Sequence, residues 1–141
     1  MSTILNKIAS ILAFIIGAMA IFAGGKVLLG IDPGYYVINW VPVYNYTMGI
    51  LTVFITALLI WKNSRLAIAA TIGTFSLHAL IMLLLQTVFR DTVASESIQA
   101  MTLRLIVWAI ILGLMFIRSR QLVRRDSSLP SHSAQASNQP R

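Results

Sequence analysis

With 141 residues, 57% of them hydrophobic and 11% charged, this chain is too apolar for a soluble globular domain, in which about 25% of residues are charged. Its net charge of +7 favours contact with anionic lipid headgroups over nucleic acid, because no segment has the composition of a folded basic domain. The absence of cysteine excludes thiolate metal sites and disulfide exchange, and we expect no metal site.

Four apolar stretches predict an all-α membrane protein. Each has close to the roughly 20 residues with which a helix crosses about 30 Å of hydrocarbon, and all are too long for barrel strands. The predicted spans are residues 8–28, 46–61, 66–89 and 98–117. Because the connections are short, we expect one integral membrane domain over residues 1–125, a four-helix bundle with up-down-up-down topology.

The first span is expected to pack closely against a neighbouring helix. Its small residues are spaced so that they share one helical face. They are Ala13, Gly17, Ala20 and Gly24. The span also resembles a signal peptide, since Lys7 precedes the apolar run and Ala18-Met19-Ala20 resembles a cleavage site. The apolar character continues to Leu29, beyond a typical signal core, so we expect the span to be retained.

The next connection is too apolar for an ordinary loop and is expected to lie in the membrane interface. Asp32 and Pro33 resemble a helix N-cap and first helical position, and Pro42 would end that helix. We therefore expect a short interfacial helix over residues 33–41. Its aromatic residues either anchor the segment or form a lid over a cavity. They are Tyr35, Tyr36, Trp40 and Tyr44, with Tyr46 following.

The third span is expected to turn a polar face into the bundle, because polar groups in hydrocarbon are costly unless satisfied. Thr71, Thr74 and His78 follow helical spacing, and we expect Gln86 on the same face two turns further on. His78 is expected to hydrogen-bond across helices, with quinone binding, proton relay and haem ligation as alternatives. Haem ligation would need a second imidazole from another copy, since His132 lies in the predicted tail.

Polar residues near the outer ends of the spans predict a ligand site that opens to the outer leaflet. The apolar run after Arg104 is shorter than a full span, so the last helix is expected to draw Arg104 into the membrane. Arg104 then either snorkels to phosphate headgroups or holds an anionic or carbonyl-bearing ligand. The expected ligand-binding residues are His78, Gln86, Arg104, Lys26, Thr74 and Tyr46.

The distribution of basic residues predicts that both termini are cytoplasmic. With this orientation the outer side keeps a near balance of basic and acidic residues, and most Lys and Arg lie inside. The inner ones are Lys7, Lys62, Arg65, Arg118, Arg120, Arg124, Arg125 and Arg141. Residues 126–141, rich in Ser, Gln, Asn and Pro, are expected to form a disordered cytoplasmic tail.

The residues that enzymes need are missing from the predicted spans. The spans hold no Asp or Glu, which argues against a proton-coupled cation exporter, and the chain lacks a nucleophile with a base or a phosphate-binding glycine loop. We expect no catalytic residues and no intrinsic cofactor, and an accessory or lipid- or quinone-binding role. The alternatives are a redox subunit that passes electrons to quinone with a partner, and an oligomeric transporter or channel. Expected partners are membrane lipids and another membrane subunit or a second copy.

Three short motifs resemble the DoxX-like family of small four-helix membrane proteins. They are FAGGKVLL (residues 22–29), Gly49 and NSRLA (residues 63–67). The resemblance implies a bacterial inner-membrane protein, in some members a subunit linked to quinone-dependent oxidation. Gly24, Lys26 and Gly49 carry over as motif positions. Where that family often has a glutamate shortly after the glycine of the second helix, Ile50 and Leu51 stand here.

Overall fold

Over residues 2–126, which this computed structural model describes, the chain is helical with short connections. The helices are α1 (Ser2–Leu28), α2 (Val41–Leu51), the π-helical turn η1 (Thr52–Thr56), α3 (Ala57–Trp61), α4 (Ala67–Thr87) and α5 (Ser95–Asp126). With α2, η1 and α3 taken as one, four helices are long and apolar enough to cross a membrane. The predicted tail lies outside the described residues, apart from Asp126 at the end of α5.

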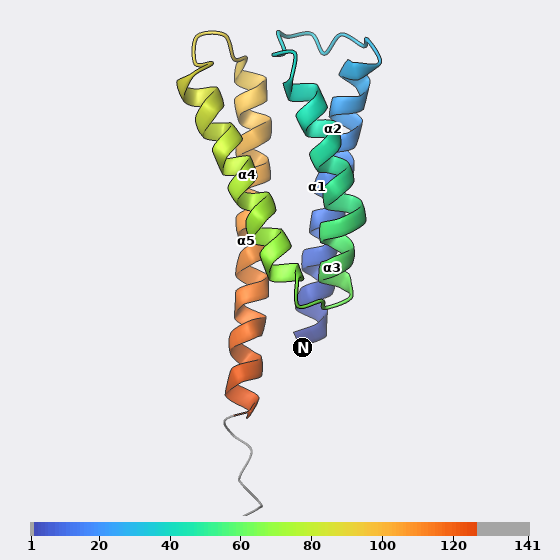
Figure 1. Ribbon diagram of the computed structural model, residues 1–141, viewed down its shortest axis with the longest axis vertical. Helices are drawn as coiled ribbons and strands as arrows, with labels where there is room; N and C mark the ends of the chain where they lie inside the picture. Colours follow the sequence, from blue (N-terminus) through green and yellow to red (C-terminus); the bar gives the residue numbers. More distant parts are fainter. Residues whose placement is uncertain (1, 127–141) are drawn as a thin grey trace, which may run out of the picture.

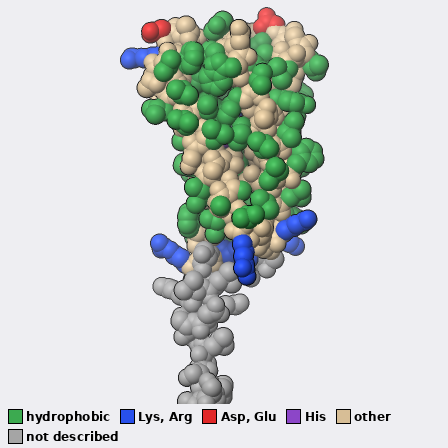
Figure 2. Space-filling model, viewed as in Figure 1, with side chains coloured by type: hydrophobic (Ala, Val, Ile, Leu, Met, Phe, Trp, Pro, Cys, Tyr) green, Lys and Arg blue, Asp and Glu red, His purple; other side chains and the backbone are tan. Residues whose placement is uncertain are grey.

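Successive helices run in opposite directions along the long axis (Figure 1). α1 packs against the second helix and against α5, and α4 packs mainly on α5. We call the end that holds the start of α1, the turn at residues 62–66 and α5 from Arg118 onward the basic end. The other end, formed by residues 29–40 and 88–94, is the loop end. Figure 2 shows most of the visible Lys and Arg side chains at the basic end, and the visible Asp and Glu side chains at the loop end, where a basic side chain also lies.

The expected interfacial helix over residues 33–41 is absent: residues 31–40 form bends, a turn and irregular backbone, and Val41 already belongs to α2. Gly34 has a φ of +82°, which no right-handed helix contains, and its N–H donates to Asp32 Oδ1 at 2.8 Å. Asp32 therefore closes a local turn and caps no helix. Pro42 does not end a helix but lies in the first turn of α2, where its missing N–H costs nothing. For this reason the second span begins at Val41, earlier than predicted.

Two helices end at a residue whose backbone is in the left-handed conformation, with a positive φ. After α1, Gly30 has a φ of +80° and its N–H donates to Val27 O, while Ile31 N–H donates to Lys26 O. Asn63 repeats this pattern after α3 with a φ of +55°. Both are Schellman motifs, in which Gly or Asn takes the left-handed position and satisfies the last carbonyl groups of the helix. The side chain of Asn63 is thereby held at the basic end.

α1 and α2 approach so closely that three glycines leave no room for a side chain. A Cβ on Gly24 would lie 2.7 Å from both Pro42 O and Tyr46 N. A Cβ on Gly49 would lie 2.7 Å from Ile21 N, and one on Gly17 would lie 2.8 Å from a methyl group of Thr52. Ala13 and Ala20 of α1 are also buried. The neighbour of the small face of α1 is thus a helix of the same chain.

The side-chain distribution is reversed relative to a soluble protein. Large hydrophobic side chains are exposed on every helix, as expected for contact with lipid. The polar residues that are buried are Asn6, Ser10, Thr52, Thr56, Thr71, Thr74, His78 and Arg104. They accompany two apolar clusters, one around Trp108 toward the basic end and one around Leu85 toward the loop end. His78 and Arg104 lie between these clusters along α4 and α5.

Candidate functional site

The buried face of α4 carries the polar residues predicted for it, with one exception. Thr71, Thr74 and His78 are buried, and the face continues through Ile81 and Leu85. Gln86 is exposed. The expectation that it shares this face is wrong, because eight residues turn a helix through about 80° beyond two full turns.

The two threonines of this face are satisfied by their own helix. Thr71 Oγ1 donates to Ala67 O at 2.8 Å, and Thr74 Oγ1 donates to Ala70 O at 2.9 Å. Thr74 Oγ1 also lies 3.4 Å from Thr56 Oγ1 of η1. This bond between two helices is the kind that buried hydroxyls form in membrane bundles. Thr74 therefore joins α4 to the second span and supports the ring of His78.

His78 is held in one orientation by its backbone and by two aromatic rings. Its Nδ1 lies 2.9 Å from Thr74 O, and because a carbonyl can only accept, Nδ1 carries the proton. In the neutral form of the ring, Nε2 is then an acceptor. Tyr44 packs edge-on at 5.7 Å between ring centroids, and Trp108 lies at 6.2 Å. Sequence reasoning missed Trp108, although its position one turn after Arg104 places it on the same face.

Arg104 is the central charge of the site. It is 7% exposed, and its Nη1 donates to Asn45 Oδ1 of α2. The hydroxyl of Tyr44 is buried beside it without a hydrogen-bond partner in the described structure. The charge of Arg104 acts on both Tyr44 and His78. We call Tyr44, Asn45, Thr74, His78 and Arg104 the Arg104 cluster.

A small cavity of about 60 Å³ connects this cluster to the loop end. Arg104 and Asn45 form its polar wall, and Tyr35 of the 29–40 segment lies over it. It has room for a few water molecules or one polar head oxygen, whereas ligand pockets for whole ring systems span about 300–1,000 Å³. His78 does not line this cavity, so it reaches a ligand there only through its neighbours.

Lys26 and Tyr46, also predicted for the site, lie elsewhere. Lys26 is exposed, with its Nζ 5.1 Å from the centre of the Phe22 ring, and it lines a surface hollow of about 300 Å³ with Asp32. This hollow adjoins the cavity, because Ala23, Val27 and Tyr35 line both, but Lys26 does not line the cavity itself. Tyr46 is 38% exposed and packs beside Gly25. The sequence therefore grouped residues that share a depth in the membrane but not a face.

The four aromatic residues predicted to form a lid take different positions. Tyr35 lies over the cavity and Tyr36 is exposed. Trp40 packs against Phe89 of the opposite loop at 5.9 Å between ring centroids, and edge-on against Tyr44 at 6.4 Å. Trp40 thus joins the two loops of this end, Tyr44 belongs to the bundle interior, and Tyr35 alone of the four covers the cavity.

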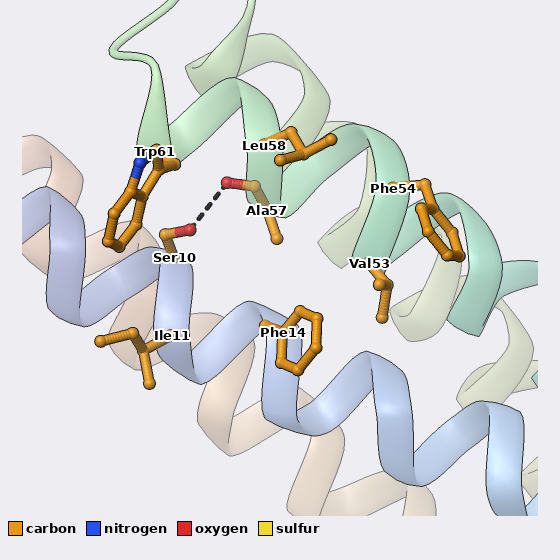
Figure 3. A pocket seen from close by; sticks show the side chains of 8 residues that line it. All are labelled: Ser10, Ile11, Phe14, Val53, Phe54, Ala57, Leu58 and Trp61. Carbon is orange, nitrogen blue, oxygen red and sulfur yellow. Dashed lines mark hydrogen bonds between the residues drawn. The ribbon is translucent and has the colours of Figure 1, made fainter.

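An apolar hollow on the described surface lies toward the basic end. It has a volume of about 440 Å³ between α1 and the η1–α3 segment. Figure 3 shows Phe14 of α1 and Val53 of η1 projecting into it, and Ser10 Oγ donating to Ala57 O at 2.7 Å beside it. The hydroxyl of Ser10 is thus already paired, and the remaining lining is apolar apart from the indole N–H of Trp61, so the hollow mainly offers contact to lipid tails.

The site is identified neither by a cluster of possible metal ligands nor by similarity to a known protein. In the part of the chain that the structure describes, no three His, Asp or Glu side chains are grouped so that they could hold a metal ion. Comparison with protein-family models, with curated proteins and with solved structures gave no match. The function is therefore inferred from the Arg104 cluster and its cavity.

Proposed function

We propose that this chain is a multi-pass protein of a bacterial inner membrane that binds the polar head of a membrane amphiphile and acts as an accessory subunit without catalysis of its own. The fold is proposed to be a transmembrane up-down-up-down bundle. Four helices of sufficient length and apolar surface support insertion. The bacterial inner membrane, and with it membership of the DoxX-like family, is suggested by the resemblance of residues 22–29, Gly49 and residues 63–67.

Both termini are proposed to be cytoplasmic. Support comes from the basic end, where Lys7, Lys62 and Arg65 surround the start of α1 and the turn at residues 62–66. Positive charge near span ends resists translocation. The acidic residues before residue 126 are all exposed and lie at or beside the loop end, where they offset its basic residues. They are Asp32, Asp91 and Glu96. The loop end, with the cavity at Arg104, then faces the outer leaflet.

The observation that carries ligand binding is the buried charge of Arg104 with a neutral partner. An isolated charge inside a membrane protein is costly, and Asn45 supplies an amide oxygen but no opposite charge. Among the described residues no carboxylate pairs with this guanidinium, since the nearby acidic residues are exposed. A phosphate, carboxylate or carbonyl oxygen in the adjoining cavity would complete the guanidinium's hydrogen bonds.

The size of the cavity favours a lipid head over a quinone. About 60 Å³ accommodates a head oxygen and its immediate substituents, while the tail stays in the surrounding bilayer. A quinone ring does not fit inside it, and only a carbonyl edge would reach Arg104. The side chains that line the cavity and can donate a hydrogen bond are Tyr35, Asn45, Ser97 and Arg104. We therefore assign acceptor-bearing lipid heads as the preferred class.

The test is retention of ligand by the full chain purified in mild detergent, with bound lipids and quinones identified by mass spectrometry. Arg104→Gln should lower retention at least about tenfold, the loss expected for one charged hydrogen bond. Arg104→Lys keeps the charge but not the planar fork, so it should also lose most of the ligand while inserting normally. Arg90→Gln, a change at an exposed arginine of the same end, is the matched control.

Equal retention by Arg104→Gln and Arg90→Gln would show that the cavity is not the site. The same preparation separates the alternatives. A stoichiometric redox partner with quinone would favour the redox subunit, and homo-oligomers with solute flux would favour the transporter.

A further inference from the structure

A second polar pocket lies at the basic end, away from the Arg104 cluster. Its volume is about 170 Å³. Four parts of the chain meet there: α1 contributes Asn6, the turn at residues 62–66 contributes Asn63 and Ser64, α4 forms one wall, and α5 contributes Arg118. The pocket therefore exists only in the assembled bundle.

Asn63 fixes the orientation of the other two polar side chains. Asn6 Nδ2 donates to Asn63 Oδ1 at 2.5 Å, and Arg118 Nη1 donates to the same oxygen at 2.7 Å. Because a guanidinium can only donate, Asn63 must present its oxygen, and Asn6 must then present its NH₂ group. Asn6 Nδ2 also lies 3.4 Å from Ile60 O, which agrees with this choice.

This arrangement leaves one acceptor and one donor without partners. Asn6 Oδ1 and Arg118 Nε are buried atoms that form no hydrogen bond in the described structure. Asn6 is only 2% exposed, so solvent at the surface does not satisfy it. Unpaired buried polar atoms are rare in folded proteins, and an ordered water, an ion or another bound group can satisfy them. A group that satisfies both must offer an acceptor to Arg118 and an O–H or N–H donor to Asn6.

The surrounding charge favours an anion. Beyond Arg118 the basic end carries four exposed cations whose side chains the structure describes: Lys7, Lys62, Arg65 and Arg120. Lys7 is held there with its Nζ 5.6 Å from the centre of the Trp61 ring. Basic pockets between membrane helices on the cytoplasmic side suit phosphate-bearing headgroups.

We propose that this pocket binds a glycerophosphate group, with a phosphate oxygen accepting from Arg118 Nε and a glycerol hydroxyl donating to Asn6 Oδ1. Phosphatidylglycerol of the inner leaflet presents both groups on one head, and free glycerol phosphate presents the same pair. The choice of the inner leaflet rests on the proposed orientation of the chain. The pocket itself requires neither ligand binding at Arg104 nor the residues of that site, so the two binding proposals can fail separately.

The experiment is a titration of the delipidated full-length protein in mild detergent, with bound lipid counted by native mass spectrometry. Phosphatidylglycerol should bind at least about tenfold more tightly than phosphatidylcholine, whose head has the phosphate but no donor for Asn6. Arg118→Gln and Arg118→Lys should each weaken phosphatidylglycerol binding about tenfold, since both remove the Nε donor. Asn6→Leu should abolish the preference for phosphatidylglycerol over phosphatidylcholine.

Arg120→Gln is the matched control, because it removes the same charge two residues away at an exposed position. It should leave binding unchanged. Equal weakening by Arg118→Gln and Arg120→Gln would overturn the proposal in favour of diffuse attraction to anionic surfaces. Equal binding of the two lipids by the unaltered protein would overturn it as well, because the pocket would then not select the headgroup. Displacement of the lipid by glycerol 3-phosphate at a similar concentration would assign the soluble source, and its failure to compete would assign the lipid. Arg118→Lys, which preserves charge and bulk, keeps the test valid if Asn6→Leu does not fold.

Discussion

Gly49→Ala is expected to destabilise the protein more than any exposed glycine replacement. The added Cβ would lie 2.7 Å from Ile21 N and 2.8 Å from Gly17 O, well inside the 3.4 Å at which ordinary contact begins. Both are backbone atoms, so no side-chain rotation relieves the clash, and α1 and α2 must move apart by several tenths of an ångström. Such a separation also weakens the dispersion contacts along the whole helix pair.

The magnitude follows from two opposing effects. Overpacking of a filled site costs about 1–3 kcal/mol, and a backbone clash belongs at the upper end of that range. Alanine is favoured over glycine within a helix by about 1 kcal/mol, which offsets part of the loss. The net expectation is a destabilisation of about 2 kcal/mol. The unfolding midpoint of the full chain, measured by circular dichroism during a denaturing-detergent titration, should fall accordingly.

Gly73→Ala and Gly113→Ala are the matched controls. Both glycines are exposed within helices, and a Cβ at either position meets nothing within 4 Å. The same substitution should therefore leave the midpoint unchanged or raise it. Gly17→Ala should be intermediate, because its Cβ meets methyl groups of Thr52 and Val53, which can shift more easily than backbone. If Gly49→Ala were as stable as Gly73→Ala, the close contact of α1 with α2 would be refuted.

Two further predictions concern a hydrogen bond and the orientation. Ser10→Ala removes the hydrogen bond to Ala57 O and should lower the free energy of unfolding by about 0.6 kcal/mol in the same titration. Thr102→Ala is the control, because its exposed hydroxyl bonds only its own helix, and it should leave that free energy unchanged. Equal losses by the two variants would contradict an inter-helix role for Ser10. Because the chain has no cysteine, Lys62→Cys and Thr92→Cys each introduce one thiol for a membrane-impermeant maleimide. In intact cells only Thr92→Cys should be labelled, and the reverse pattern would invert the proposed topology.

The helices could be predicted from the sequence because membrane insertion demands a simple property, apolar length. The ends at Leu28 and Trp61 were also predicted, but the start of the second helix was not, because one residue can serve opposite roles. Pro42 can follow one helix or open the next, and the choice depends on the positive φ of Gly34 and on the packing of Gly24 against the start of α2. The π-helical turn at Thr52–Thr56 had no signal either, since it adjusts the second helix to its neighbours.

The site could be predicted only in part, for a related reason. Spacing along one helix correctly placed Thr74 and His78 in the interior, because position on a helical face is a local property. Contacts between helices are not local: Arg104 and Asn45 are 59 residues apart, and Arg118 and Asn63 are 55 apart. The sequence indicates how deep in the membrane each residue lies, so it predicts which residues are at the same level. It does not predict which of them face one another.

These two arginine–asparagine pairs connect the proposals for the two ends of the molecule. Each joins α5 to the second span or the turn that follows it, and in each the partner is a neutral amide. A carboxylate in the same place would cancel the charge. An amide orients the guanidinium and leaves its charge available to an anionic or carbonyl oxygen. On the two proposals, a helix pinned in this way would present one fixed cation toward each leaflet.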